Sequence, residues 1–212
     1  MYIPGPHEET DVAVLHSLMR SRPLGAWVLH ADGELLVNHI PFLIDPDGEY
    51  GTLRGHIARA NPAWKALPSA NASLVIFQGA ESYITPSWYP SKHDTGRAVP
   101  TWNYAVVHAH GTPRAIDDPL WLRDHLSRAT DFHEADASEP WKLSDAPADF
   151  VDRLLGAIVG IEIPIRRLVG KWKTSQNRPD ADKRGVVAGL LDRGDDRARA
   201  MADLVRLHVS EP

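Results

Sequence analysis

Residues 24–57 read LGAWVLHADGELLVNHIPFLIDPDGEYGTLRGHI, and this stretch decides the fold class. It contains three runs rich in apolar and β-branched residues, each of strand length, at 24–30, 34–44 and 50–57. The connections Ala31-Asp32-Gly33 and Asp45-Pro46-Asp47-Gly48 contain the residues that favour tight turns between antiparallel strands. The stretch therefore predicts a three-stranded antiparallel meander.

The rest of the chain adds strands in succession, with helices set beside them. Further strands are predicted at 73–78, 83–85, 99–111 and 158–168, and Pro164 indicates an edge or a bulge in the last one. Helices are predicted from Thr10 to before Pro23, after Asn61-Pro62, and at 117–133, 147–155, 183–191 and 195–208, with a long loop at 86–97. Because strands do not alternate with helices, a doubly wound parallel sheet is disfavoured. An antiparallel barrel of about six strands with peripheral helices fits better.

Length and composition are those of a single globular domain spanning residues 1–212. The chain has 43% hydrophobic and 24% charged residues and contains no cysteine, which excludes disulfides and thiolate chemistry. No run approaches the 18 apolar residues of a membrane span, and the N-terminal residues lack the pattern of a secretory signal. We therefore expect a cytoplasmic protein without a membrane partner.

Charge is distributed unevenly around a formal net charge of -5. Residues 117–152 hold ten acids and three bases, whereas residues 166–178 hold five bases and no acid. Such runs are commonly solvated surfaces. In the basic run, however, an indole and several amides lie between the cations, which favours a ligand site over a plain solvated loop.

The segment Gly170-Lys171-Trp172-Lys173-Thr174-Ser175-Gln176-Asn177-Arg178 has the groups that hold a phosphorylated, flat ligand. Its cations give charge-assisted hydrogen bonds to phosphate, and its hydroxyl and amide groups hydrogen-bond polar edges. Arg59 and the predicted cap Asn61 are a second phosphate candidate, for which an ordinary capped helix is an equal alternative. Thr101, Trp102 and Asn103 add an indole and polar groups, although on its own such a run is more often core packing than a ligand wall.

Other site classes find little support in the sequence. It contains no GxGxxG, Walker, GxSxG, HExxH or EF-hand motif. His108 and His110 share one face of a predicted strand, but no third ligand at diagnostic spacing accompanies them, so a hydrogen-bonded histidine pair is the preferred interpretation over a metal site. No metal site is predicted.

Several blocks together resemble the PaiB-like family of FMN-binding transcriptional regulators. They occur in order over nearly the whole chain: Tyr2-Ile3-Pro4, Asn38-His39-Ile40-Pro41-Phe42, Gly55-His56-Ile57-Ala58-Arg59-Ala60-Asn61-Pro62, Pro86-Ser87-Trp88-Tyr89, Val99-Pro100-Thr101-Trp102-Asn103-Tyr104, Gly170-Lys171-Trp172-Lys173 and Ser175-Gln176-Asn177. The acidic segment from Ala135 to Asp145 is the variable part.

The resemblance implies a mainly β, α+β fold: an antiparallel split β-barrel of the FMN-binding, pyridoxamine-phosphate-oxidase-like type. It further implies a homodimer that binds FMN in clefts at the subunit interface. Matched to the chemistry of FMN, the residues divide into phosphate ligands, a ring wall and partners for the polar edge of the ring. The candidates are Arg59, Asn61, Lys171 and Lys173 for the phosphate, Trp102 for the wall, Asn103, Gln176 and Asn177 for the edge, and Thr101, Ser175, His39 and His56 as further contacts.

Three functions remain open at this point. The resemblance implies a transcriptional regulator, but DNA binding rests on family analogy alone, since no helix-turn-helix is evident and the net charge is negative. An FMN-dependent oxidoreductase that draws electrons from a nicotinamide cofactor is the alternative. The loop at 86–97, with Trp88, Tyr89, Lys92 and His93, is placed to cover a substrate in that case. A flavin-binding protein without turnover is the third interpretation.

Overall fold

The computed structural model describes residues 1–92 and 96–210, so His93 of the predicted covering loop lies outside the described residues. Contacts within the chain divide it into two compact units. Unit 1 comprises Met1–Leu18, Gln78–Val107 and Val169–Pro212, and unit 2 comprises Met19–Phe77 and His108–Leu168. Of the described helices, none is long and apolar enough to cross a membrane.

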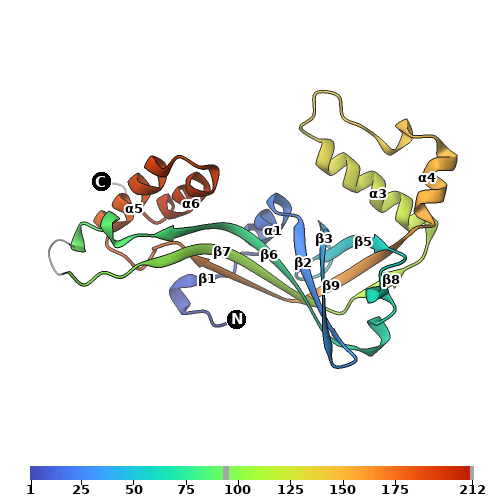
Figure 1. Cartoon of the computed structure of the whole chain (residues 1–212), viewed down its shortest axis with the longest axis horizontal. Helices are drawn as coiled ribbons and strands as arrows, with labels where there is room; N and C mark the ends of the chain where they lie inside the picture. Colours follow the sequence, from blue (N-terminus) through green and yellow to red (C-terminus); the bar gives the residue numbers. More distant parts are fainter. Residues whose placement is uncertain (93–95, 211–212) are drawn as a thin grey trace. The chain divides into compact units, whose positions relative to one another are not determined.

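The described strands form a sheet with the order β3-β2-β6-β7-β9-β5-β4, and β1 and β8 pair with β9 beside this path. Three of them, β6, β7 and β9, are long and contribute residues to both units (Figure 1). The strands are β1 (Glu8–Glu9), β2 (Leu24–Ala31), β3 (Glu34–Pro41), β4 (Leu43–Asp45), β5 (Thr52–Ala58), β6 (Ala70–Ile84), β7 (Thr101–Gly111), β8 (Arg114–Ile116) and β9 (Ile158–Lys173). The mainly β, α+β class is confirmed, and the fold is the split β-barrel that the resemblance implied.

In unit 2 the first predicted hairpin is confirmed. Strands β2 and β3 pair antiparallel from Leu24↔Pro41 to Ala31↔Glu34, and the turn residues Asp32 and Gly33 have φ of 53° and 80°. Positive φ at both central residues is what a two-residue hairpin turn of this twist requires.

The predicted turn at 45–48 is confirmed, since β4 and β5 pair antiparallel across it, but the predicted strand at 34–44 is wrong as one continuous strand. The strand that begins at Glu34 ends at Pro41. The amide of Phe42 then donates to the carbonyl of Pro23 (2.9 Å), and the chain leaves the β2–β3 ladder. The short strand β4 then pairs with β5, and β5 pairs with β9 along Thr52↔Pro164 to Ala58↔Ile158. A sequence separation of 100 residues or more hides the β5–β9 pairing from local patterns.

Pro164 lies inside β9 and is paired on the β5 side. In the strand order β9 lies between β7 and β5, and Pro164 pairs with Thr52 of β5. The pairing of β9 with β8 ends two residues earlier, at Glu162. The predicted alternation is confirmed in part, since Ile161, Ile163 and Ile165 are all buried.

Alternating residues of β2 face the core of unit 2. Trp27, Leu29 and Ala31 are buried, and the indole N–H of Trp27 donates to Ser73 Oγ (3.0 Å), so its polar atom is satisfied. Phe42 and Phe77 meet edge to face, with ring centroids 6.3 Å apart. Such interlocked aromatic and aliphatic side chains provide most of the stabilisation of a small sheet domain.

Two helices accompany the sheet in unit 2. Helix α3 (Pro119–Glu134) begins after Asp118, whose carboxylate accepts from the amide of Leu120 (2.8 Å), and α4 (Ala148–Leu155) follows a single 3₁₀ turn, η5 (Leu143–Asp145). Leu122, Val151 and Leu155 form a small core between them. The predicted helix after Asn61 is two 3₁₀ turns, η2 (Pro62–Trp64) and η3 (Leu67–Ser69).

A network of ion pairs stabilises α3 against the sheet in unit 2. The buried carboxylate of Asp45 pairs with Arg54 (2.7 Å) and with Arg128 of α3, and the buried Glu162 pairs with Arg54 (3.0 Å) and Arg114. Each buried acid is therefore shared by two guanidinium groups, which offsets the cost of removing the charges from water.

In unit 1, η1 (Gly5–His7) precedes β1, and α1 (Val12–Ser21) begins after Asp11, whose carboxylate accepts from the amide of Ala13 (2.8 Å). The 3₁₀ turn η4 (Pro86–Trp88) follows β6. Helices α5 (Asp180–Arg193) and α6 (Asp196–Arg206) lie side by side at the C-terminal end (Figure 1) and enclose a core that includes Tyr89. Gly194, with φ of 79°, ends α5 where the sequence predicted a break.

Candidate cofactor-binding site

The basic segment is a strand end followed by a turn. Lys171 and Lys173 belong to β9, which extends beyond the predicted end at residue 168, and Ser175 has a left-handed backbone with φ of 62°. The amide of Gln176 closes the turn, because its oxygen accepts from the amide of Thr174 (2.7 Å) and its nitrogen donates to the carbonyl of Trp172 (2.5 Å). Gln176 thus shapes the segment with both ends of its side chain.

Residues of β7 meet this turn directly. Asn103 Nδ2 donates to Ser175 Oγ (2.9 Å), and both side chains are buried. Lys173 Nζ donates to the hydroxyl of Thr101 and to the carbonyl of Trp102 (2.9 Å). The structure therefore brings together two groups of candidates that lie about 70 residues apart in the sequence.

A cavity of about 130 Å³ opens at this junction in unit 1. Its lining residues are Tyr89, Val99, Pro100, Thr101, Asn103, Lys173, Ser175, Asn177 and Arg178. A cavity needs only about 10–15 Å³ of volume on this measure to hold one water molecule, so this one admits a group of several heavy atoms. The cavity is therefore of the right size for a phosphate group, with hydroxyl, amide, ammonium and guanidinium groups in its wall.

Three cations gather at this site without a carboxylate partner among the described residues. Lys171 Nζ donates to the carbonyl of Tyr2 (3.2 Å) and lies 5.2 Å from the ring centroid of Tyr104. Arg178 lies 4.7 Å from the ring centroid of Tyr89. Burial first, and then the charges of Lys171 and Arg178, lower the pKa of Lys173. An anion in the cavity relieves this repulsion, so the donor set fits a phosphate.

Trp102 points away from that cavity. Successive residues of a strand face opposite sides of the sheet, and burial agrees, because Asn103 is 1% exposed and Trp102 is 54% exposed. The indole of Trp102 meets Tyr83 of β6 edge to face, with centroids 6.1 Å apart. The pair forms an exposed aromatic surface on the other face of the strand.

Arg59 and Asn61 lie in unit 2, and their side chains make structural contacts there. The guanidinium of Arg59 donates to both carboxylate oxygens of Asp117 (2.8 and 2.5 Å) and to the carbonyls of Gly156 (2.8 Å) and Ile158 (3.0 Å). The hydrogen bond from Arg59 is the main cause that lowers the pKa of Asp117. A phosphate at Arg59 has to compete with this carboxylate.

Asn61 is the predicted cap, and its role is confirmed. Its oxygen accepts from the amide of Ala63 (3.0 Å), while its nitrogen donates to Asn38 Oδ1 (2.7 Å). His39 lies exposed on β3. His56 of β5 has its Nδ1 3.2 Å from Nε2 of His125, a residue of α3.

Arg178, Tyr89 and Tyr83 lie at the site but were not among the predicted FMN contacts. Arg178 and Tyr89 line the cavity, and Tyr83 forms the aromatic pair with Trp102. Arg178 stands at the end of the basic segment, which was a usable signal. Tyr83 and His125 carried no local signal, because their partners are distant in the sequence.

The predicted histidine pair of β7 is close in space. The rings of His108 and His110 have centroids 6.4 Å apart, and Nε2 of His110 lies 3.0 Å from a guanidinium nitrogen of Arg167. Within residues 1–92 and 96–210 no group of three or more histidine or acidic residues is arranged to hold a metal ion.

Comparison with known proteins identifies the family. The family model described as "Putative FMN-binding domain" matches residues 1–167. An uncharacterized protein of Emericella nidulans is 36% identical, with 97% of this chain and 96% of that protein covered. The protease synthase and sporulation protein PAI 2 of Bacillus subtilis is 27% identical, with 97% and 96% covered.

A solved structure shares the fold. The FAD and heme binding protein from Mycobacterium smegmatis superimposes with a TM-score of 0.57 at 17% identity, over 79% of this chain and 73% of that chain. The sequence match over most of the chain and the shared barrel agree with the phosphate-sized cationic cavity in unit 1. The chain belongs to the PaiB-like family of FMN-binding split-barrel proteins, and its cofactor is FMN.

Proposed function

We propose that the cavity of unit 1 receives the phosphate of FMN. The observation that carries this proposal is the cluster of Lys171, Lys173 and Arg178, which have no carboxylate partner among the described residues and stand beside a cavity of about 130 Å³. Thr101 and Ser175 add hydroxyl groups, and Asn103 and Asn177 add amides. Bound FMN supplies hydride and electron transfer.

The remaining candidate residues have other roles in this proposal. Gln176 positions the turn by its two hydrogen bonds to the backbone. Arg59, Asn61, His39 and His56 belong to unit 2 and remain predicted FMN contacts. Residues 1–212 are proposed to form one FMN-binding domain, because three strands contribute to both units.

We further propose a homodimer in which the ring wall comes from the second subunit. Trp102 faces the side of β7 opposite to Asn103, so within one subunit the sheet separates the indole from the phosphate cavity. Large apolar side chains are exposed in both units, among them Tyr2, Leu35 and Leu120 at 83%, 67% and 79%. Such residues are common where two subunits meet.

The phosphate assignment is tested with FMN and riboflavin, which differ by the phosphate alone. The double variant Lys171→Ala/Lys173→Ala should lose at least about tenfold in FMN affinity, the value of one charge-assisted hydrogen bond, and little in riboflavin affinity. Lys142→Ala, at an exposed position in unit 2, is the matched control. Equal losses for both ligands, or unchanged FMN retention, would refute the assignment.

Subunit exchange tests the homodimer. Light scattering should give twice the mass of one chain. A mixture of Trp102→Ala and Lys171→Ala/Lys173→Ala subunits should regain FMN binding that neither variant shows alone, since half of the sites in mixed dimers are intact. A monomeric mass, or no recovery in the mixture, contradicts the shared site.

The function that we propose for the flavoprotein is transcriptional regulation. Its support is membership of the family and the similarity to a Bacillus subtilis protein named for protease synthesis and sporulation. The basic cluster is assigned to the phosphate of FMN, so DNA binding is expected to depend on the flavin state. A gel shift of promoter DNA at two salt concentrations, with and without FMN, tests this. If the protein shows no preference for promoter DNA over random DNA, the proposal of transcriptional regulation is refuted.

The alternative is an oxidoreductase that takes electrons from a nicotinamide cofactor. The bound flavin is the feature that favours it. Steady consumption of NADH or NADPH by the FMN-loaded protein, measured by absorbance, supports the enzyme. Single reduction of the flavin without turnover supports the regulator or a flavin carrier.

A further inference from the structure

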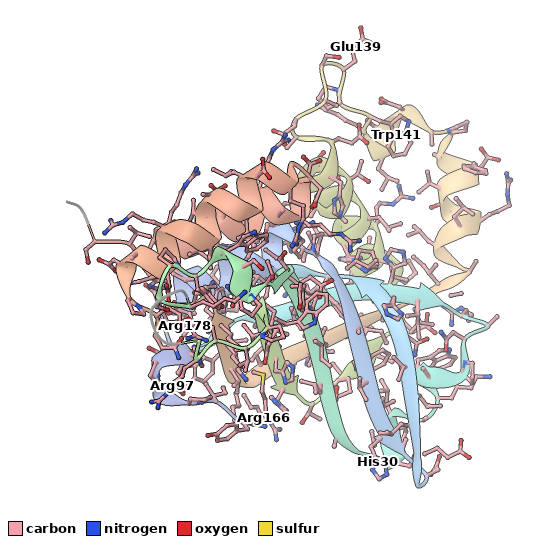
Figure 2. The ribbon with its side chains drawn as sticks, turned by 60° about the vertical axis from the view of Figure 1, so that its left-hand side comes forward. His30, Arg97, Glu139, Trp141, Arg166 and Arg178 are labelled. Atoms are coloured by element: carbon pink, nitrogen blue, oxygen red, sulfur yellow. The ribbon has the colours of Figure 1, made fainter. Side chains whose placement is uncertain are left out.

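Unit 2 contains a second and larger cavity, of about 310 Å³, and none of its lining residues lines the cavity assigned to the phosphate of FMN. Its wall is formed by the end of β3, by β4 and β5, by α3 and by Trp141, which projects from the segment between α3 and α4 (Figure 2). The lining residues are Pro41, Phe42, Leu43, His56, His125, Leu126, Ala129, Thr130, His133, Glu134 and Trp141. The volume is at the lower end of the range of small-molecule sites, which suits a single substituted ring.

The charge of this wall selects against anions. Its described lining includes the carboxylate of Glu134 and no lysine or arginine. Burial lowers the pKa of His56, and burial together with the neighbouring charges of His56, Arg128 and Arg54 lowers that of His125 to about 4, although Asp45 opposes this. Both imidazoles are therefore neutral at pH 7, and neither offers a cation to a phosphate or carboxylate.

The two histidines form a directional pair. Nδ1 of His56 lies 3.2 Å from Nε2 of His125, and the ring of Trp121 stacks on His125 at 5.2 Å and 18°. Between two neutral imidazoles one nitrogen donates and the other accepts. The two outer nitrogens consequently have opposite characters: when His125 Nδ1 carries a proton, His56 Nε2 is an acceptor, and when it does not, His56 Nε2 is a donor.

One end of the pair is open to a ligand. His125 Nδ1 is buried and has no hydrogen-bond partner, so it is not the contact point. His56 is less buried, and its Nε2 has no hydrogen-bond partner among the described residues, although its ring lines the cavity. A ligand at Nε2 has to match a nitrogen that either donates or accepts. A hydroxyl group does both.

We propose that this cavity binds a small uncharged aromatic compound with one hydroxyl group, a phenol, whose hydroxyl meets Nε2 of His56. The ring lies among Phe42, Leu43, Leu126 and Trp141, which provide apolar and aromatic surface. This cavity differs from the phosphate cavity in its charge. If it does not bind phenol, the assignment of the phosphate cavity to FMN is unchanged.

Three ligands of similar size test the chemistry: phenol, toluene and benzoate. Calorimetric titration of the FMN-loaded protein at pH 7.5 should show phenol binding about tenfold more tightly than toluene, which lacks the hydrogen bond, and more tightly than benzoate, which is anionic. Equal affinity for phenol and toluene, tighter binding of benzoate, or no heat from phenol at millimolar concentration overturns the proposal.

Two substitutions of the same kind locate the site. Ala129→Phe fills the cavity from α3 and should abolish phenol binding, whereas Ala135→Phe, at the exposed end of the same helix, should leave it intact. His56→Phe keeps a ring and removes the hydrogen bond, so it should equalise phenol and toluene. Ala129→Phe and Ala135→Phe should retain FMN. Phenol binding that survives Ala129→Phe, or a preference for phenol over toluene that persists in the folded His56→Phe variant, overturns the proposal.

Discussion

The side-chain amide of Asn103 donates a 2.9 Å hydrogen bond to the hydroxyl of Ser175, and this buried contact joins β7 to the turn that follows β9. Ser175 has φ of 62°, a conformation that non-glycine residues rarely adopt without support. The hydrogen bond and the two backbone contacts of Gln176 supply that support. The shape of the cavity that we propose for the phosphate of FMN therefore depends on residues that do not all line it.

This contact predicts coupling between the two residues. Asn103→Ala and Ser175→Ala should each lower the free energy of unfolding by about 1–2 kcal/mol, because each leaves a buried polar group without its partner. The double variant should lose less than the sum, with a coupling of about 1 kcal/mol in a double-mutant cycle measured by urea unfolding. Additive losses would show that the two side chains do not interact in solution.

The sequence predicted features that depend on neighbours along the chain. The Asp32-Gly33 hairpin, the Asn61 cap and the end of α5 at Gly194 follow from local turn and capping chemistry. The sequence also identified the basic segment at 170–178, because the cations and amides of this segment lie within nine residues. The resemblance to a family added the fold and the cofactor, which local patterns alone did not specify.

Long-range pairing lay outside the reach of the sequence. The meander prediction missed the break of residues 34–44 into β3 and β4, and it missed the pairing of β5 with β9, because no residue near Ile57 indicates a partner at Ile158. Arg59 was predicted as a phosphate ligand, yet its bidentate partner Asp117 lies 58 residues away. The His56–His125 pair joins residues 69 positions apart, and neither histidine has a distinctive neighbourhood in the sequence. Which charges neutralise one another is a property of the packed structure.

The buried pair of histidines predicts a loss of stability in acid. The pKa of His125 is lowered from 6.5 to about 4, mainly by burial, so the unfolded chain binds this proton more tightly than the folded one. Its contribution is fully present above pH 6.5 and is lost as the pH falls towards 4. The loss is on the order of 3 kcal/mol.

Urea unfolding at pH 7.5, 6, 5 and 4.5 measures this loss. His125→Phe lacks the titrating group, so its free energy of unfolding should fall less over the same interval than that of the wild type. His39→Phe, at an exposed position on β3, is the control and should follow the wild type. Parallel pH profiles for wild type and His125→Phe would contradict the assignment to this histidine.

Gly189 in α5 is predicted to resist replacement by alanine. In a solvent-exposed helix interior that change stabilises by about 1 kcal/mol. Here a Cβ atom would lie 2.2 Å from the indole of Trp88, and Arg193 stacks on the same ring at 4.9 Å. The resulting displacement should cost about 1–3 kcal/mol. Gly156→Ala, where the nearest atom is 3.4 Å away, is the comparison and should be close to neutral in thermal unfolding. A stabilised Gly189→Ala variant would mean that Trp88 packs differently.

Asp182 carries the last prediction, because its carboxylate is fully buried in unit 1. One oxygen accepts from the amide of Ser91 (3.0 Å) and the other from its hydroxyl (2.7 Å), which fixes the chain after Tyr89 against α5. Tyr89 in turn lines the phosphate cavity and contacts Arg178.

Asp182→Ala should lower the free energy of unfolding by about 2–4 kcal/mol, since the amide and hydroxyl of Ser91 lose a charged acceptor. It should also weaken FMN binding, because Tyr89 loses its support, whereas Asp192→Ala, at an exposed site of the same helix, should change neither quantity. Urea unfolding and FMN fluorescence titration separate the two effects: a destabilised Asp182→Ala variant with full FMN affinity at low temperature would show that the segment from Ser91 to Tyr89 does not shape the site.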